Sequence, residues 1–339
     1  MTSQLILITG VSGYIGFKTM IIALEAGHQV RAVIRRHEQA SRLTVHPRVQ
    51  DYVSRLEFVV VPDLARTAAF DPILTNVVGI LHLASPLAIE TDDFEKDIVQ
   101  AAIGVTNSVL KAAKRHPSIR RVVMTSSAVT LIPYEWLSNP DSEAVFTELD
   151  INSNPIRPFH NSMQAYWASK ALSRMASNSF IAERKPQFEL INLLPTVVIG
   201  PDELATDAAS LLSGTRALVM GPVLGQKSDI ALLGIQVHVD DVARAHVDAL
   251  NPSVPGNSEY VLSSDGPDGI QWNDAVEIIA SAFPGAMATL PLDGSLDTIK
   301  VKIDVSTTEK AFRWKFQSFR RAMKDLVGQY LELLEGEER

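Results

Sequence analysis

Cysteine is absent from this sequence of 339 residues, and so is any long apolar run. Without cysteine the chain can have no disulfide framework, no thiolate nucleophile and no cysteine-based metal site. No apolar run reaches the roughly 18 residues that a membrane-spanning helix requires. Basic side chains are in the minority, since 31 Lys and Arg face 39 Asp and Glu, for a formal net charge of −8. This charge argues against a nucleic-acid partner and against a basic membrane-binding face.

Two further absences concern metals and targeting. The eight histidines show no ligand spacing such as His-Glu-x-x-His, so we predict no metal site. The first strand-like run begins at Leu5, which leaves no room for a cationic segment and a cleavage site. We therefore expect a cytoplasmic protein. A hydrophobic share of 46% and a charged share of 21% are typical of a globular chain with a sizeable core.

Short apolar segments alternate with helix-like ones through the first half of the chain. Five segments rich in Val, Ile and Leu are expected to be buried strands, at 5–9, 30–34, 56–61, 78–83 and 121–126. Four helix-like stretches lie between them, at 14–26, within 37–55, at 66–75 and at about 93–115. This alternation predicts an α/β fold of the Rossmann type, in which a doubly wound parallel sheet carries helices on both faces.

The pattern changes after the fifth strand. Residues 133–162 contain four prolines and should form a long ordered loop, which is uncommon unless the loop is functional. A helix at about 163–183 and a strand at 188–194 follow. Glycine and proline then become frequent in 200–235 and 264–300, and a last helix is expected at 319–334.

Three glycines follow the first predicted strand in the segment Ile-Thr-Gly-Val-Ser-Gly-Tyr-Ile-Gly, residues 8–16. Gly10 would allow a tight turn, Gly13 a close approach of the backbone to a pyrophosphate, and Gly16 close packing of the helix on the sheet. The N-terminus of that helix would present free N–H groups to phosphates. The alternative is a glycine-rich turn that binds no ligand. The strand before the loop and the helix after it favour the dinucleotide site.

Tyr166 and Lys170 are four residues apart on a predicted helix, so both side chains lie on one face. One interpretation is an ordinary surface pair in which the lysine stem packs on the ring. The other is a phenol whose pKa is lowered by a neighbouring ammonium. The spacing alone does not separate these two interpretations.

The glycine segment, Thr125-Ser126-Ser127 at a strand end and Tyr166-x-x-x-Lys170 together resemble the extended short-chain dehydrogenase/reductase family. The sequence is most similar to the dihydroflavonol-reductase-like branch, which includes cinnamoyl-CoA reductases and fungal aldehyde and ketone reductases. The resemblance covers nearly the whole chain. It extends to the segments His-Leu-Ala-Ser-Pro at 82–86, Leu-Pro-Thr-Val-Val-Ile-Gly-Pro at 194–201, His-Val-Asp-Asp-Val-Ala-Arg-Ala-His at 238–246 and Lys-Ala-Phe-Arg-Trp-Lys-Phe at 310–316.

The resemblance implies a catalytic triad of Ser127, Tyr166 and Lys170. Tyr166 would give a proton to the developing alkoxide, Lys170 would lower the phenol pKa and bind the nicotinamide ribose, and Ser127 would hold the carbonyl oxygen. Ser127 rather than Ser126 matches the family pattern, because it directly precedes the small residue Ala128. The alternative role for Ser127 is that of a helix cap or turn residue.

The end of the second strand indicates NADPH as the cofactor. Where an NAD enzyme of this fold carries an acidic residue, this chain has Ile34 followed by Arg35 and Arg36, and Arg42 matches a basic residue of the related reductases. Arginine suits the 2′-phosphate, although these arginines could instead be solvated charges at a helix start. The resemblance implies cofactor contacts by Gly10, Ser12, Gly13, Tyr14, Ile15, Gly16, Arg35, Arg36, Arg42, Asp63, Leu64, Leu83, Ala84, Ser85, Tyr166, Lys170, Pro195 and Val198.

The substrate pocket is expected to be mostly apolar. By family position its walls would be Pro86, Phe94, Val129, Tyr134, Met163, Trp167, Met220 and Gly221. Each of these could instead be a core residue, and Asp63 could be a simple turn aspartate. Asp240-Asp241 could suggest a metal, but an N-cap for a helix at about 242–250 is simpler.

The domain organisation follows from the same resemblance. We expect residues 1–199 to form a dinucleotide-binding Rossmann domain, which also receives about 236–263 through a strand at 260–262. Residues 200–235 and 264–339 should form a smaller substrate-binding lobe. The chain would be a monomer, or a homodimer assembled through its two long helices.

The expected activity is reduction of a ketone or aldehyde by NADPH, with a small organic carbonyl compound as substrate. Two alternatives stay open. One is an alcohol or sterol dehydrogenase, or an epimerase, of the same fold. The other is a dinucleotide-sensing regulator without catalysis, which intact Ser127, Tyr166 and Lys170 disfavour. The sequence does not identify the substrate.

Overall fold

A seven-stranded sheet organises the chain in the computed structural model, which describes residues 4–66, 68–86, 88–138, 140 and 143–337. In spatial order the strands are β11 (Ser258–Leu262), β7 (Glu189–Pro195), β5 (Arg121–Thr125), β4 (Gly79–His82), β1 (Leu5–Thr9), β2 (Gln29–Ile34) and β3 (Leu56–Val60). Every pairing from β3 across to β7 is parallel. The strand order reverses between β1 and β4, which is where ligands bind in sheets of this kind.

This sheet confirms the predicted α/β fold. The predicted strands are present to within two residues at each end, because strands buried on both faces are continuous apolar runs. Ile6, Leu7 and Ile8 of β1 are fully buried. The strand at 260–262 also returns to the main sheet, as predicted, as part of β11.

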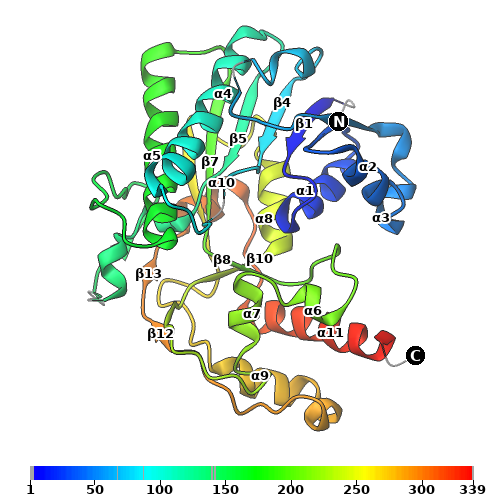
Figure 1. Cartoon of the computed structure of the whole chain (residues 1–339), viewed down its shortest axis with the longest axis vertical. Helices are drawn as coiled ribbons and strands as arrows, with labels where there is room; N and C mark the ends of the chain where they lie inside the picture. Colours follow the sequence, from blue (N-terminus) through cyan, green and yellow to red (C-terminus); the bar gives the residue numbers. More distant parts are fainter. Residues whose placement is uncertain (1–3, 67, 87, 139, 141–142, 338–339) are drawn as a thin grey trace. The chain divides into compact units, whose positions relative to one another are not determined.

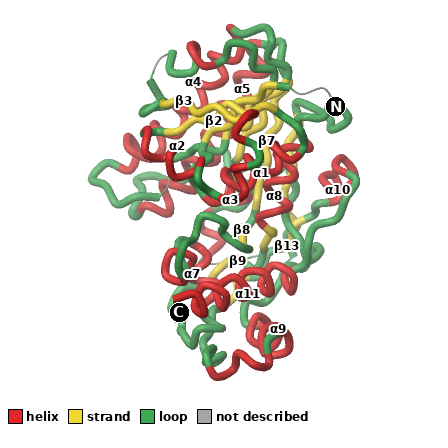
Figure 2. Tube along the Cα trace, turned by 90° about the vertical axis from the view of Figure 1, so that its right-hand side faces the viewer, coloured by secondary structure: helices red, strands yellow, loops and turns green. Residues whose placement is uncertain are grey.

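Helices cover both faces of the sheet (Figures 1 and 2). On one face lie α1 (Tyr14–Glu25), α2 (His37–Thr44) and the short α3 (Pro47–Gln50). On the other, α4 (Ala101–Arg115) and α5 (Ser162–Arg184) pack against each other. The helix predicted from 93 begins as a wider π-helical turn at Glu95–Gln100 and continues as α4.

The helix predicted at 66–75 is wrong. Around Thr67, which lies outside the described residues, the chain forms turns and one short 3₁₀ segment, Asp71–Ile73. Ala68 has a left-handed φ of +62°, and Pro72 has no N–H to donate. The apolar residues of this stretch, such as Phe70 and Leu74, are nevertheless fully buried in the core that α4 covers.

Two compact units divide the chain. The first consists of Met1–Tyr134, Glu148–Leu194 and Ala243–Tyr260, and the second of Glu135–Thr147, Pro195–Val242 and Val261–Arg339. The expected domain ranges, 1–199 with 236–263 against 200–235 with 264–339, stay a prediction.

The second unit has its own apolar core. Trp272, Phe319 and Leu326 are among its buried side chains. Its elements are β6 (Val145–Phe146), β8 (Val197–Ile199), α6 (Ala208–Leu211), α7 (Thr215–Met220), β9 (Leu232–Leu233), β10 (Gln236–His238), α9 (Asp274–Ala282), β12 (Thr298–Ile299), β13 (Lys302–Ile303), α10 (Ser306–Phe312) and α11 (Phe319–Glu337), with α8 (Val239–Asp248) shared between the two units. The last predicted helix is α11.

The predicted N-cap at Asp240-Asp241 is wrong. Helix α8 begins at Val239, so both aspartates lie within its first turn. His238 takes the capping role, because its Nδ1 accepts a 3.0 Å hydrogen bond from the Asp240 N–H. The Asp241 carboxylate accepts hydrogen bonds from the backbone N–H and side-chain amide of Gln317, at 2.6 and 3.2 Å. Asp241 therefore joins two parts of the second unit.

Candidate active site

The glycine loop lies between the end of β1 and the start of α1. Gly10 has a left-handed φ of +80°, and a Cβ there would lie 3.0 Å from the backbone nitrogen of Ala84. A Cβ at Gly16 would lie 2.0 Å from the Gly10 carbonyl oxygen. Gly10 therefore needs to be glycine for the tight turn that the sequence indicated, whereas Gly16 needs to be glycine because it approaches the Gly10 carbonyl of the loop.

Gly13 differs from the other two glycines, because a Cβ there would meet only the Gly10 carbonyl oxygen, at an ordinary 3.5 Å. Gly13 is also the N-cap of α1, and it has no side chain to cap the first N–H groups of the helix. Uncapped N–H groups beside an uncrowded glycine form an environment that suits a phosphate. The loop thus fits the pyrophosphate of a dinucleotide.

Thr9 joins the glycine loop to the next strand of the sheet. It pairs with His82 across β1 and β4, and its Oγ1 accepts hydrogen bonds from the N–H groups of Leu83 and Ala84, at 3.1 and 3.0 Å. The same oxygen lies 3.0 Å from His82 Nδ1. Because the Thr9 hydroxyl oxygen accepts hydrogen bonds from two N–H groups, it donates its own hydrogen to His82 Nδ1. His82 is therefore the neutral tautomer with its hydrogen on Nε2. Burial and, to a lesser extent, the charge of Lys170 together lower the pKa of His82 to about 3.

Ser127 and Tyr166 meet at the carboxyl end of β5. Ser127 follows that strand, and its side chain acts on the Tyr166 phenol of α5, whose pKa it lowers. The Ser127 hydroxyl also accepts a 3.3 Å hydrogen bond from the Val129 N–H, so the capping role considered from the sequence is present as well. Ser127 thus caps a short turn and contacts the phenol at once.

Lys170 is buried rather than part of a surface pair. Its side chain is 8% exposed, and its Nζ lies 5.5 Å from the centroid of the Tyr166 ring. Nζ donates a 2.9 Å hydrogen bond to Ser85 Oγ, in the loop after β4. Burial lowers the pKa of Lys170 to about 8. The lysine therefore joins α5 to the edge of the sheet where the glycine loop lies.

The phenol pKa departs from the sequence-based expectation. Burial raises the pKa of Tyr166 to about 12, and the interaction with Ser127 only partly opposes this rise. The expectation of a more acidic phenol is therefore wrong for the protein without ligands, since removal from water dominates its pKa. Tyr166 is protonated in this state, which suits a proton donor.

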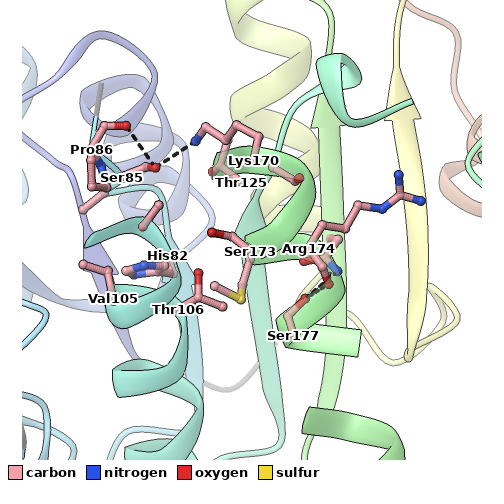
Figure 3. A pocket seen from close by; sticks show the side chains of 15 residues that line it. His82, Ser85, Pro86, Val105, Thr106, Thr125, Lys170, Ser173, Arg174 and Ser177 are labelled. Atoms are coloured by element: carbon pink, nitrogen blue, oxygen red, sulfur yellow. Dashed lines mark hydrogen bonds between the residues drawn. The ribbon is translucent and has the colours of Figure 1, made fainter. Parts of the chain in front are cut away.

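A narrow cavity extends from Lys170 into the space between helices α4 and α5 and the sheet (Figure 3). The cavity has a volume of about 30 Å³, enough for about two water molecules. Polar side chains line much of it, including Ser85, Thr106, Lys170, Ser173, Ser177 and Asn192. The cavity connects the lysine with a polar interior.

The end of β2 carries the three arginines expected at a 2′-phosphate. Arg35 and Arg36 are exposed, and Arg42 lies in the last turn of α2. Gln39 organises this corner: its Oε1 accepts hydrogen bonds from the N–H groups of Arg35 and Arg36, and its Nε2 donates to Ser12 Oγ at 2.8 Å. The arginine turn is thereby tied to the glycine loop, as a shared phosphate site would require.

The other residues predicted to contact the cofactor have identifiable places in the fold. The Asp63 carboxylate accepts a 2.9 Å hydrogen bond from the Ala65 N–H, which is the turn role considered as the alternative. Leu64 packs on the apolar core. Pro195 ends β7, and Val198 is partly buried in β8. Tyr14 and Ile15 open α1 beside the glycine loop. Their contacts with a cofactor stay predictions.

The predicted pocket-wall residues fall into two groups. In the first unit, the rings of Tyr134 and Trp167 pack edge to face, 5.5 Å between centroids, and the Trp167 indole donates to the Ile132 carbonyl. Trp167 is thus buried, whereas Met163 is 45% exposed. Phe94 packs against the π-helical turn Glu95–Gln100 and α5, Pro86 lines the cavity, and Val129 is partly buried.

Met220 and Gly221 belong to the second unit. Met220 is fully buried in the core of that unit, and Gly221 caps the end of α7. The core role considered for Met220 is thus present. Contact of either residue with a substrate stays a prediction.

For three residues at the site the sequence predicted no individual role, although two of them lie in segments that carry the family resemblance. Thr9 and His82 act as a pair across β1 and β4, and the signal for them is their place as the last residue of each strand. Gln39 could have been found as the third residue after the helix N-cap Arg36, a position from which a glutamine side chain accepts a hydrogen bond from the N-cap N–H.

Among the described residues, no group of three or more His, Asp or Glu side chains could hold a metal ion. Nor does the described part of the chain contain a helix long and apolar enough to cross a membrane.

Comparison with known proteins gives consistent results. The family model described as the NAD dependent epimerase/dehydratase family matches residues 6–262. A protein named ketoreductase CTB6, from Cercospora nicotianae, is 37% identical over 349 residues, covering 100% of this chain and 98% of the relative. A protein named NAD-dependent epimerase/dehydratase ALT6, from Alternaria alternata, is 30% identical over 325 residues, covering 91% of this chain and 92% of the relative.

The fold also matches solved structures. Yeast methylglyoxal/isovaleraldehyde reductase Gre2, crystallised with NADPH, superposes with a TM-score of 0.82 at 23% identity, covering 98% of this chain and 99% of that chain. With the family match over 6–262, this likeness of fold confirms the resemblance to extended short-chain dehydrogenases/reductases. The chain belongs to the NAD-dependent epimerase/dehydratase family.

Proposed function

We propose that this protein is an NADPH-dependent reductase of a ketone or aldehyde, in which Tyr166 donates the proton. The observation that carries this proposal is the placement of three groups. The Ser127 side chain acts on the Tyr166 phenol and lowers its pKa, and the Nζ of buried Lys170, one helical turn away, lies 5.5 Å from the centroid of the Tyr166 ring. These groups lie at the carboxyl edge of a parallel sheet, to which the Lys170–Ser85 bond ties them. The 37% identity to a protein named ketoreductase supports the same assignment.

Each residue of the triad has a distinct task. The bound dinucleotide supplies the hydride. Tyr166 holds its proton up to about pH 12 in the protein without ligands, so it can give that proton to an alkoxide at neutral pH. Ser127 would donate its hydroxyl hydrogen to the carbonyl oxygen and stabilise the charge that develops there. The Lys170 ammonium favours negative charge on the phenol after the proton has left.

The preference for NADPH rests on Arg35, Arg36 and Arg42. Guanidinium groups bind a phosphate with paired, charge-assisted hydrogen bonds. Gln39 ties the backbone of the first two to Ser12 in the glycine loop. An acidic residue that would accept ribose hydroxyls and repel a 2′-phosphate is replaced here by Ile34 and the arginines after it.

The substrate of this proposal is a small organic carbonyl compound, with neither nucleic acid nor a membrane as partner. The protein would act in the cytoplasm as a monomer or a homodimer. An oxidising dehydrogenase or an epimerase of the same fold is the alternative, and one relative carries the name epimerase/dehydratase.

The test is NADPH oxidation by the purified protein against a panel of aldehydes, diketones and aryl ketones, followed at 340 nm. The proposal predicts turnover with at least one carbonyl compound, and much slower turnover with NADH. Conversion of alcohols with NAD, without reduction of any carbonyl, would favour the alternative. Dinucleotide binding with no turnover in either direction would indicate the non-catalytic regulator.

A further inference from the structure

The cavity between α4, α5 and the sheet contains a hydroxyl group without a protein partner. Ser173 Oγ is buried, and it makes no hydrogen bond with any described residue. Its side chain points into the cavity from α5, toward the side on which His82 and Thr106 lie (Figure 3). A buried polar group left without a partner is unfavourable, so such groups normally bind water. The cavity has room for about two water molecules.

Two other serines of α5 show that this arrangement is not general for the helix. Ser169 Oγ donates to the Tyr166 carbonyl at 2.7 Å, and Ser177 Oγ donates to the Arg174 carbonyl at 2.8 Å. A serine within a helix commonly forms such a bond with the preceding turn. Ser173 instead leaves its hydroxyl available to the cavity.

Ser173 lies three residues after Lys170, on the same face of the helix. Both residues line the cavity, and the Lys170 ammonium has three hydrogens, one of which goes to Ser85. Within the described residues, no carboxylate lies within ion-pair distance of Lys170. The charge of this buried ammonium therefore depends on neutral hydrogen-bond partners.

The titratable groups around Lys170 do not supply a negative charge that would balance the ammonium. His82 faces it from β4 and is neutral. Tyr166 faces it from the preceding turn of α5 and is protonated. Arg174, which also lines the cavity, is ion-paired with Glu259. Water in the cavity is therefore a source of solvation for the ammonium.

We propose that Ser173 is a positioning residue that holds a buried water molecule against Lys170 and thereby keeps the lysine charged at neutral pH. The consequence for catalysis rests on the proposed reductase function, because only there must Lys170 stay charged. The water site itself does not depend on that function. The depressed pKa of Lys170, about 8, makes the lysine sensitive to the loss of one partner.

The matched variants are Ser173→Thr and Ser173→Val, which have the same shape and differ only in a hydroxyl and a methyl group. Ser169→Ala is the control, because its hydroxyl is satisfied within the helix. The direct measurement is the pKa of Lys170, from the pH titration of its ε-carbon by NMR, with the signal assigned through Lys170→Arg. A crystal structure of the wild type at about 1.5 Å would show the water.

The proposal predicts that Ser173→Val lowers the Lys170 pKa by roughly one unit, since a buried ammonium loses solvation. The alkaline limb of the kcat profile should move to lower pH by the same amount. Ser173→Thr and Ser169→Ala should stay close to wild type. Equal pKa values in the Thr and Val variants, or a wild-type cavity without water, would overturn the proposal.

These outcomes are separable from those of the proposed function. If the wild type reduced no carbonyl compound, the reductase assignment would fail. The NMR titration and the crystal structure would still decide whether Ser173 holds water against Lys170.

Discussion

Lys170 Nζ donates a 2.9 Å hydrogen bond to Ser85 Oγ, and this bond joins helix α5 to the loop after β4. Gly10 approaches the neighbouring residue of that loop, because a Cβ on it would lie 3.0 Å from the Ala84 nitrogen. One buried lysine thus connects the helix that carries Tyr166 with the edge of the sheet that carries the glycine loop. The site is held together by a charged group in a place where burial is costly.

This relationship predicts a conflict between stability and activity at Lys170. Burial lowers its pKa from 10.5 to about 8, which corresponds to roughly 3 kcal/mol of unfavourable free energy for the charged lysine at pH 7. Lys170→Met keeps the length of the side chain without the charge. We expect this variant to lose carbonyl reduction yet to unfold at a temperature a few degrees higher than wild type.

The pH dependence gives the control for that prediction. Between about pH 8 and 10.5 the unfolded lysine binds more protons than the folded one, so wild-type stability should rise with pH in this window. The methionine variant should lack this rise. A variant less stable than wild type at pH 7 would show that the Ser85 bond outweighs the cost of burial.

His82 predicts a loss of stability in mild acid. Its pKa is about 3 in the folded chain and 6.5 in a model peptide, so the unfolded state binds more protons as the pH falls below 6.5. Between pH 7 and pH 5 the wild type should lose roughly 2 kcal/mol more of its unfolding free energy than His82→Gln does. Urea unfolding at the two pH values measures this, and parallel curves would contradict the neutral assignment of His82.

The choice between the two adjacent serines is also testable. Ser127→Ala should lower kcat by ~10²–10³-fold with little effect on stability, because one donor to the carbonyl oxygen is lost. Ser126→Ala should have the smaller effect, since the ordered contact of Ser126 with β7 is its backbone bond to the Leu193 carbonyl. A larger loss of kcat in Ser126→Ala would mean that the assignments must be exchanged.

Arg35 tests the cofactor preference. A charge-assisted hydrogen bond contributes about 1.5–3 kcal/mol, so Arg35→Ala should weaken NADPH binding by about 10–150-fold and leave NADH binding unchanged. The dissociation constants of both cofactors measure this, with Lys111→Ala on α4 as a charge-removing control on the other face of the sheet. Equal affinity of the wild type for NADPH and NADH would overturn the assignment of the 2′-phosphate site.

The sheet could be predicted from the sequence because its strands are buried on both faces. Such strands are unbroken apolar runs, and β1, β2 and β5 begin and end within one residue of the predicted limits. The segment 66–75 could not be predicted in the same way. Its apolar spacing suits a helix, but the residues reach the core from turns, with Ala68 in a left-handed conformation.

Spacing placed Tyr166 and Lys170 on one helix face, yet it contains no information on depth. How far a phenol is removed from water depends on residues distant in sequence. Here burial raises the Tyr166 pKa, whereas the spacing to Lys170 predicted a lower one. The Thr9–His82 pair likewise requires the register between β1 and β4. Ser173 is an ordinary helix serine until its hydroxyl is seen to lack a partner.

The central claim is that Tyr166 gives the proton to the reduced carbonyl, and Tyr166→Phe tests it most directly. The ring and its packing survive in this variant, and only the hydroxyl is removed. With the best carbonyl substrate of the wild type, kcat should fall by ~10²–10⁴-fold while the dissociation constant for NADPH stays nearly unchanged. A variant that keeps more than about a tenth of the wild-type kcat would contradict the account, since another group would then supply the proton.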